Sequence, residues 1–306
     1  MPGDENQYDV LCYGTVSVDN IIHVPHLPGP RRDVQAISEH DELGGEALKV
    51  ALPLAVWGLR VLVAGNVIGT DRRAKFILEE LSRHPDLDAR YIRQDPGVAT
   101  PFARVIVTPD GERSRITSGY EKAPQTELTA EMMQQAQLLS VDAYGCAERE
   151  RAASAAHVLG KRIITADALW PQSPLASLSD VVIISGALLK LNFPGAYEYD
   201  HALALQQQGA GVVIITDGPR PVLVVRADGS PFGVEPYEIR DVGDTSSAGT
   251  MFKAGIIYSW LQAGWSLEHA VRFACAAAGL SCQRRPKDAP LPRLAEIAAL
   301  MGGQPR

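Results

Sequence analysis

The chain has 306 residues, of which 46% are apolar and 21% are charged. This composition supplies a full hydrophobic core, so it excludes a disordered linker. Acidic side chains outnumber basic ones by 36 to 29, and the resulting net charge of −7 opposes binding to the phosphate backbone of nucleic acid.

The sequence has none of the usual marks of a membrane-bound, secreted or zinc-binding chain. No apolar run approaches the roughly 20 residues that cross a bilayer, and residues 1–8 are too polar for a signal peptide. The four cysteines, at positions 12, 146, 275 and 282, are too widely spread for a zinc knuckle and too few for a disulfide scaffold. We therefore expect a cytoplasmic protein with no membrane partner, no nucleic-acid partner and no metal site made of cysteine and histidine.

Short apolar runs alternate with longer segments of helical character along the chain. Runs rich in β-branched residues predict buried strands at 10–13, 61–64, 162–166, 181–184 and 212–216. Helix-like spacing or composition predicts helices at 47–58, 72–84, 130–139, 148–159 and 197–208. Strands that are apolar throughout indicate helices on both faces of a parallel sheet. The predicted fold class is α/β, with a doubly wound, mostly parallel sheet flanked by helices.

Two segments interrupt this alternation. Residues 21–43 are polar and contain several prolines and glycines, and residues 102–108 and 113–117 form two alternating runs around a Pro-Asp-Gly-Glu turn. We expect both segments, about 20–43 and 100–118, to form one small accessory β-sheet. This sheet is either a lid that excludes water from an active site or a surface hairpin without a role in function. In both cases the whole chain, 1–306, is expected to form one domain.

The most informative stretch for function is the run of small residues before an apolar helix at about 252–262. Backbone amides at the start of a helix lack intrahelical acceptors, and the helix dipole makes that end electropositive. A simple N-cap needs only one Ser, Thr or Asp, whereas here Asp, Thr, Ser, Ser, Ala and Gly follow one another. The stretch predicts an anion site formed by Ser247, Ala248 and Gly249. The usual mononucleotide and dinucleotide loop motifs do not occur in the sequence.

Residues Asp244 to Phe252 resemble the D-T-x-[GA]-A-G-D-aromatic signature of the PfkB, or ribokinase-like, carbohydrate kinases. The resemblance covers nearly the whole chain and implies a ribokinase-like fold with a small β lid. It implies sugar-binding roles for residues early in the chain and at the start of the signature: Gly14, Asp19, Gly44, Gly45 and Asp244. It implies nucleotide-binding roles for two residues of a Thr-Asp-Gly segment after a late strand, Thr216 and Gly218.

Three positions depart from the pattern of that family. Thr250 stands where the family has the Asp that accepts a proton from the sugar hydroxyl, and a hydroxyl cannot take that proton near neutral pH. General-base help is worth roughly 10²–10⁴-fold. The family's N-x-x-E element, which helps to organise magnesium, reads Ser185-Gly186-Ala187-Leu188. The family's G-G-x-x-x-N element ends in Lys49 instead of Asn.

Lys49 suggests a ligand with an anionic group, such as a phosphate or a carboxylate, which the ammonium would meet as a point charge. Two arginines of the predicted lid, Arg104 and Arg115, are candidates to assist it. The alternative is that Lys49 is paired with Glu46 or another carboxylate of the protein.

Three aspartates near predicted strand or helix ends have two interpretations each. The resemblance gives Asp244 a role in holding a sugar hydroxyl or a cation, and the alternative is that it caps the following turn. Asp71 and Asp167 lie just after predicted strands, where α/β proteins bind ligands, or they are only loop or helix caps.

Two functions follow from the motifs and the resemblance. The first is a carbohydrate kinase that transfers the γ-phosphoryl group of ATP, with Mg²⁺, to a hydroxyl of a sugar or nucleoside, slowly because Thr250 is not a base. The second is a pseudokinase that binds a sugar-like ligand or a nucleotide as a sensor or interaction protein. The resemblance also makes a homodimer formed through the lid an expectation.

Overall fold

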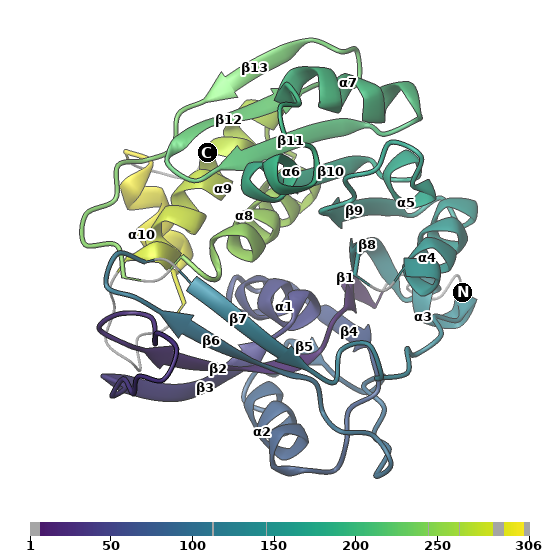
Figure 1. The fold of residues 1–306 in the computed structure, drawn as a ribbon. Helices are drawn as coiled ribbons and strands as arrows, with labels where there is room; N and C mark the ends of the chain where they lie inside the picture. Colours follow the sequence, from purple (N-terminus) through teal and green to yellow (C-terminus); the bar gives the residue numbers. More distant parts are fainter. Residues whose placement is uncertain are drawn as a thin grey trace.

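The computed structural model describes residues 7–111, 113–144, 146–243, 245–262, 264–283 and 291–302. Its central sheet has the strand order β13-β12-β11-β10-β9-β8-β1-β4-β5 (Figure 1). All neighbours from β5 to β11 pair in parallel, and β12 and β13 are added antiparallel at one edge. The strands are β1 (Tyr8–Gly14), β4 (Val61–Gly65), β5 (Leu87–Asp88), β8 (Ala136–Asp142), β9 (Arg162–Ala166), β10 (Val181–Ser185), β11 (Val212–Asp217), β12 (Arg220–Val225) and β13 (Pro231–Val234).

Helices cover both faces of this sheet, as the apolar strands predict. Alternate residues of β1 point to opposite faces: Val10 and Cys12 join one buried cluster, and Leu11 and Tyr13 join the other. The first cluster is completed by α1 (Glu46–Val56), α2 (Arg72–Leu81), α8 (Ala248–Ile256), α9 (Leu267–Cys282) and α10 (Leu294–Leu300). The second is completed by α3 (Ala130–Gln134), α4 (Cys146–Val158), α5 (Pro174–Ser177), α6 (Gly186–Asn192) and α7 (Glu198–Gln207). A π-helical segment, Ile257–Gln262, continues α8.

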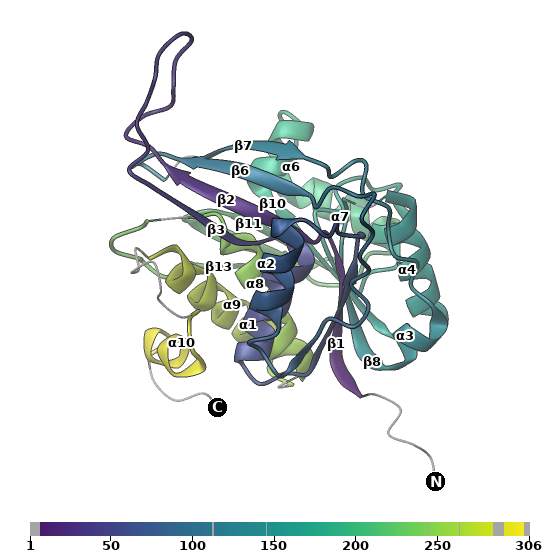
Figure 2. The ribbon, with the colours of Figure 1, turned by 90° about the horizontal axis from the view of Figure 1, so that it is seen from below.

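The two interrupting segments form one four-stranded sheet, as predicted. Its order is β3-β2-β6-β7, with β2 (Ser17–His23), β3 (Ser38–Gly44), β6 (Phe102–Val107) and β7 (Arg113–Ser118). β2 and β6 pair in parallel at its centre, and each has an antiparallel partner outside. Figure 2 shows this sheet crossing one end of the central sheet. Since β2 begins three residues after β1 ends, the small sheet stands at the carboxyl end of the parallel strands.

One predicted helix is wrong in its second half. Residues 130–139 were expected to be helical, but α3 ends at Gln134 and β8 follows from Ala136 to Asp142. The run Ala-Gln-Leu-Leu-Ser-Val-Asp has a single β-branched residue, so its composition does not favour a strand. Its place between β1 and β9, with parallel pairing on both sides, overrides that local preference.

The register of the parallel strands brings several predicted site residues to one edge. Gly14 lies opposite Gly65, Asp142 opposite Ala166, and Ser185 opposite Thr216. Ligands of open α/β sheets bind outside this carboxyl edge. Among the described helices, none is both long enough and apolar enough to cross a membrane.

Candidate active site

The first turn of α8 is open, as the run of small residues predicts. An added Cβ at the exposed Gly249 would meet no atom within 4 Å. The amide of Ala248 donates to the Thr245 carbonyl at 3.2 Å. Ser247 precedes the helix and uses no side-chain cap of its own. The turn therefore has open space at Gly249, beside the electropositive start of a helix.

Thr250 does not offer a free hydroxyl to this turn. Its Oγ1 donates a hydrogen bond of 3.0 Å to the Ser247 carbonyl, three residues earlier in the same turn. The side chain is thus bound to its own helix, a common arrangement for Thr within helices. The position that the resemblance assigns to a proton acceptor holds a hydrogen-bond donor instead.

Three predicted sugar-binding glycines lie where larger residues would not fit. A Cβ on Gly14 would lie 2.6 Å from Asp142 Oδ2, and one on Gly44 would lie 2.5 Å from Asp19 Oδ1. Gly45 has φ +85°, and a Cβ there would lie 2.1 Å from the Thr15 carbonyl oxygen. Glycine is therefore required for close approach at Gly14 and Gly44, and also for backbone conformation at Gly45. These contacts gather β1, β2 and the start of α1 around one place.

Asp19 lies between two cations on the inner side of the small sheet. Lys49 Nζ is 2.7 Å from Asp19 Oδ2, and Arg115 Nη2 is 3.4 Å from Asp19 Oδ1. The Asp19 side chain is 3% exposed and that of Lys49 is 12% exposed. The structure thus pairs Lys49 with a carboxylate of the protein, which is the alternative to an anionic ligand. Arg115 Nη2 also reaches Tyr120 Oη at 3.4 Å.

Arg104 does not join this group. Asp19 pairs with Ala103 in the register of β2 and β6, so Arg104, the next residue, points to the opposite face of the small sheet. Its guanidinium lies 5.6 Å from the centre of the Phe102 ring. Of the two lid arginines considered as partners for Lys49, only Arg115 lies on the face of Asp19.

A buried ion pair that was not predicted lies next to Gly14 and Thr15. Arg149 Nε donates to Asp142 Oδ1 at 3.0 Å, and both side chains are at most 1% exposed. Asp142 Oδ2 accepts from the amide of Thr15 at 2.7 Å and from its hydroxyl at 3.0 Å. Asp142 therefore fixes the turn that follows Gly14. The sequence offered no signal for the role of Asp142, because this aspartate ends β8, a strand that was not predicted.

Asp167 holds the neighbouring strand ends together. Its Oδ1 accepts from the Ser185 amide at 3.0 Å, and Tyr144 Oη donates to its Oδ2 at 2.8 Å. Asp167 itself has φ +57°. Its contacts are those of a loop cap, the second of the two interpretations made from the sequence.

A second unpredicted ion pair lies between α1 and α8. Lys253 Nζ is 3.3 Å from Glu46 Oε1 and donates to the Val141 carbonyl at 2.8 Å. The Lys253 side chain is 1% exposed and that of Glu46 is 13% exposed. Burial raises the pKa of Glu46, and the charge of Lys253 opposes that rise. A lysine within the apolar run Met-Phe-Lys-Ala-Gly was a usable signal, since buried lysines need a partner.

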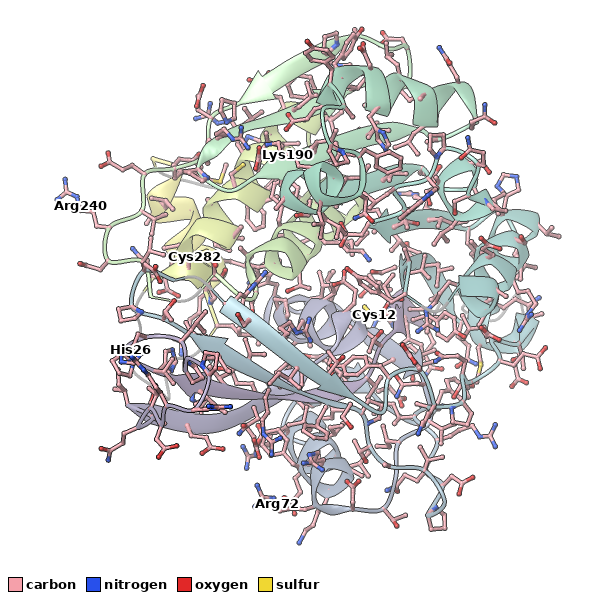
Figure 3. All side chains as sticks on the ribbon, in the orientation of Figure 1. Cys12, His26, Arg72, Lys190, Arg240 and Cys282 are labelled. Carbon is pink, nitrogen blue, oxygen red and sulfur yellow. The ribbon has the colours of Figure 1, made fainter. Side chains whose placement is uncertain are left out.

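The predicted nucleotide residues lie at the carboxyl end of β11. Thr216 Oγ1 donates to the Ile184 carbonyl at 3.4 Å, and Gly218 has φ +58° with open space at its Cβ position. Asp217, between them, is bound by Lys190 and by Arg220. Figure 3 shows Lys190 beside α6 in the upper half of the view and Arg72 beside α2 at the bottom.

Two further residues complete the predicted set. Asp71 caps α2: its Oδ1 accepts from the amides of Arg73 and Ala74, each at 3.0 Å. This is the capping role that was one of its two interpretations. Asp244 lies outside the described residues, so its two interpretations remain as predicted.

The magnesium-organising element that the resemblance predicts is replaced by a helix start. Ser185 caps α6, its Oγ accepting from the Leu188 amide at 3.4 Å. The described residues include no group of three or more His, Cys, Asp and Glu placed to hold a metal ion.

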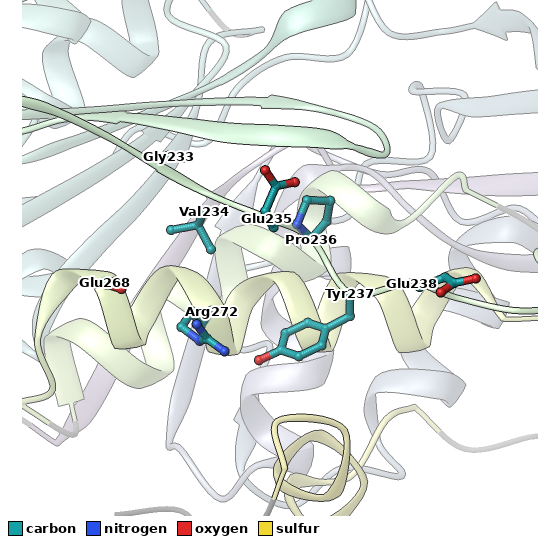
Figure 4. A pocket seen from close by; sticks show the side chains of 8 residues that line it. All are labelled: Gly233, Val234, Glu235, Pro236, Tyr237, Glu238, Glu268 and Arg272. Atoms are coloured by element: carbon teal, nitrogen blue, oxygen red, sulfur yellow. The ribbon is translucent and has the colours of Figure 1, made fainter.

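A pocket lies along α9 and the segment after β13 (Figure 4). It is lined by Gly233, Val234, Glu235, Pro236, Tyr237, Glu238, Glu268 and Arg272. None of these is a predicted site residue. The pocket is therefore distinct from the strand ends and the α8 turn.

Comparison with known proteins agrees with this arrangement. A solved acarbose kinase, Mak1, of microbiome origin is 23% identical, with a TM-score of 0.83 over 97% of this chain and 99% of its own. Ribokinase from Arabidopsis thaliana, solved with ribose and ATP, is 19% identical, with a TM-score of 0.78 over 97% and 99%. These two likenesses establish the ribokinase-like fold.

Sequence comparison finds relatives as well. Acarbose 7(IV)-phosphotransferase from an Actinoplanes species is 26% identical over 301 residues, covering 90% of this chain and 92% of the relative. The model of the pfkB family of carbohydrate kinases matches residues 7–294. The chain therefore belongs to the pfkB family of carbohydrate kinases.

Proposed function

We propose that this protein, acting as a single ribokinase-like domain over residues 1–306, transfers the γ-phosphoryl group of ATP to a hydroxyl of a sugar or sugar-like substrate. The observation that carries the proposal is the open first turn of α8 at Gly249. Phosphoryl transfer depends mainly on positioning and on stabilising charge. An open, electropositive helix start can supply both.

The assignments within the site follow the same proposal. Ser247, Ala248 and Gly249 hold the migrating phosphoryl group, and Gly14, Asp19, Gly44 and Gly45 line the sugar pocket, with Lys49 positioning Asp19. Thr216 and Gly218 lie on the nucleotide side. Asp244 belongs to the proposal through the family signature alone. Mg²⁺ enters with ATP and neutralises its phosphates, because magnesium keeps most of its waters and needs few protein ligands. The relatives named for acarbose and ribose support a sugar as the acceptor.

Turnover is expected to be slow, because Thr250 donates to Ser247 and accepts no proton. The second candidate function is a pseudokinase that senses a sugar-like ligand or nucleotide. It is favoured by this threonine and by the two cations that form ion pairs with Asp19. Under either function the protein acts in the cytoplasm, and a homodimer through the small sheet is part of the proposal.

One assay separates the two functions. ADP release is measured with ATP and, in turn, D-ribose, D-fructose, D-glucose, acarbose and adenosine, for the wild type and for Thr250→Asp. A kinase shows acceptor-dependent release that the variant raises at least about tenfold, since it gains a general base. The pseudokinase is the correct function if both proteins bind ligands, as calorimetry reports, and neither releases ADP.

A further inference from the structure

The carboxylate of Glu46 lies between the two parts of the site that the proposed reaction has to join. Glu46 begins α1 directly after Gly45, and the next amide, that of Ala47, would be 3.3 Å from a Cβ on Gly14. The Ala47 amide also donates to the Thr15 carbonyl at 3.2 Å. The start of α1 is thus in contact with the glycines that line the proposed sugar pocket.

On its other side, Glu46 reaches the helix of the anion site. Lys253 follows Gly249 by four residues and Thr250 by three, so these residues share one face of α8. A long helical side chain points back toward the N-terminus of its helix. This geometry directs the Lys253 side chain toward the first turn of α8. Its ammonium donates to the Val141 carbonyl near the end of β8 at 2.8 Å, and Glu46 Oε1 meets it there at 3.3 Å.

The surroundings of Glu46 favour a carboxylate that can take up a proton. Burial raises its pKa, the charges of Asp142 at the end of β8 and of Asp167 after β9 raise it further, and only Lys253 on α8 lowers it. Cys12 on β1 faces the same pair; burial raises the pKa of its thiol to about 12, so it stays uncharged. Tyr144 senses the charge of Glu46 as well, and it too remains neutral. With 13% of its side chain exposed, Glu46 is only partly buried.

We propose that Glu46 accepts the proton of the substrate hydroxyl, as a slower substitute for the aspartate that Thr250 replaces, and that Lys253 holds the carboxylate in position. The inference rests on the proposed kinase function. The hydroxyl oxygen forms a bond to the γ-phosphorus of ATP, and the bond from that phosphorus to the bridging oxygen breaks, with its electron pair leaving on ADP. The hydroxyl proton passes to a Glu46 carboxylate oxygen and is later released to water.

The test compares Glu46→Gln, Thr250→Asp and the double variant, using whichever acceptor of the panel the wild type phosphorylates. Glu46→Gln is expected to lower kcat by about 100-fold or more, to leave KM nearly unchanged, and to remove the fall in kcat at low pH. Adding Thr250→Asp to Glu46→Gln is expected to restore kcat to within about tenfold of the Thr250→Asp single variant, because it supplies another base. If Glu46 had only a structural role, Thr250→Asp would not restore the kcat lost in Glu46→Gln.

The outcomes that overturn the inference are distinct from failure of the kinase function. If Glu46→Gln keeps kcat within about threefold of the wild type, or loses activity that Thr250→Asp does not restore, Glu46 is not the acceptor. If Glu46→Gln does not fold with Lys253 unpaired, the Glu46→Gln/Lys253→Met variant removes both charges, and the same expectations apply to it. If the wild type phosphorylates no acceptor of the panel, the proposed function fails and this inference fails with it.

Discussion

Lys49 and Asp19 form an ion pair of 2.7 Å at the junction of α1 and the small sheet. The second oxygen of Asp19 is 3.4 Å from Arg115. A carboxylate proposed to bind a neutral sugar hydroxyl is thus held between two cations of the protein. The pair connects β2 to α1, so it contributes to the position of the small sheet as well as to the chemistry of the pocket.

Replacing Lys49 with Met should destabilise the protein, because it leaves the buried Asp19 with only the partly exposed Arg115. Removing one partner of a buried pair costs about 3–5 kcal/mol, and Arg115 offsets part of this, so we expect a loss of about 2–3 kcal/mol in the free energy of unfolding. Urea denaturation measures it.

The matched control for this change is Lys75→Met, since Lys75 forms an exposed pair with Glu79 on α2 at 3.6 Å. That pair should be worth about 0.5 kcal/mol or less. Equal losses in the two variants would show that the Lys49–Asp19 pair has no special role. Thermal shifts with neutral and acidic sugars, measured on the same proteins, test whether Lys49 also meets an anionic ligand.

Gly249→Ala should separate stability from activity. The Cβ would meet no atom within 4 Å, and Ala is favoured over Gly in a helix, so stability should stay the same or rise by about 0.5–1 kcal/mol. The new methyl group would occupy the space proposed for the phosphoryl group. We therefore expect kcat/KM for ATP to fall by about tenfold or more.

The control for Gly249 is Gly255→Ala in the same helix, where a Cβ would lie 2.6 Å from the Ala274 Cα. Overpacking there should cost about 1–3 kcal/mol of stability. A Gly249→Ala protein with wild-type activity would argue against a phosphoryl site at this turn.

Asp71→Ala should remove the cap of α2, and the resulting loss of stability should depend on pH. Burial alone would raise the pKa of Asp71, but hydrogen bonds from the amides of Ala74, Thr100 and Arg73 outweigh it and lower the pKa. Its stabilisation is therefore fully present above the ordinary pKa of 3.8 and is lost as pH falls through the lower folded value. At pH 7 the variant should lose about 1–2 kcal/mol. The difference from the wild type should shrink steadily toward about pH 2, and a difference independent of pH would contradict the charged cap.

The parts of the fold that local sequence determines were predicted well. β9 has the predicted bounds, and β1, β4, β10 and β11 extend the predicted strands by a few residues at most. Their β-branched residues and their burial on both faces leave a strong local signal. β8 was missed because only its neighbours β1 and β9 make it a strand. Sequence could not reveal that tertiary pairing.

The same contrast between local sequence signals and tertiary contacts applies to the site. Gly45, Gly249 and Thr250 were identified from motifs. The backbone at Gly45 requires glycine, Gly249 belongs to the run of small residues before α8, and Thr250 departs from the family signature. Glu46 and Lys253 are 207 residues apart in the chain, and no local pattern reports their contact. The orientation of Arg104 away from Asp19 likewise depends on strand register, which the sequence of the hairpin alone did not settle.

The central claim is that the first turn of α8 receives the γ-phosphate of ATP. Its most direct measurement is the backbone amide NMR spectrum of the ¹⁵N-labelled protein during titration with ADP and, separately, with the non-hydrolysable analogue AMP-PNP, each with Mg²⁺. Both nucleotides should shift the resonances near Gly218, and AMP-PNP alone should strongly shift those of Ser247 and Gly249. If AMP-PNP binds and leaves the Gly249 amide unchanged, or instead shifts the segment that lines the α9 pocket, the account is contradicted.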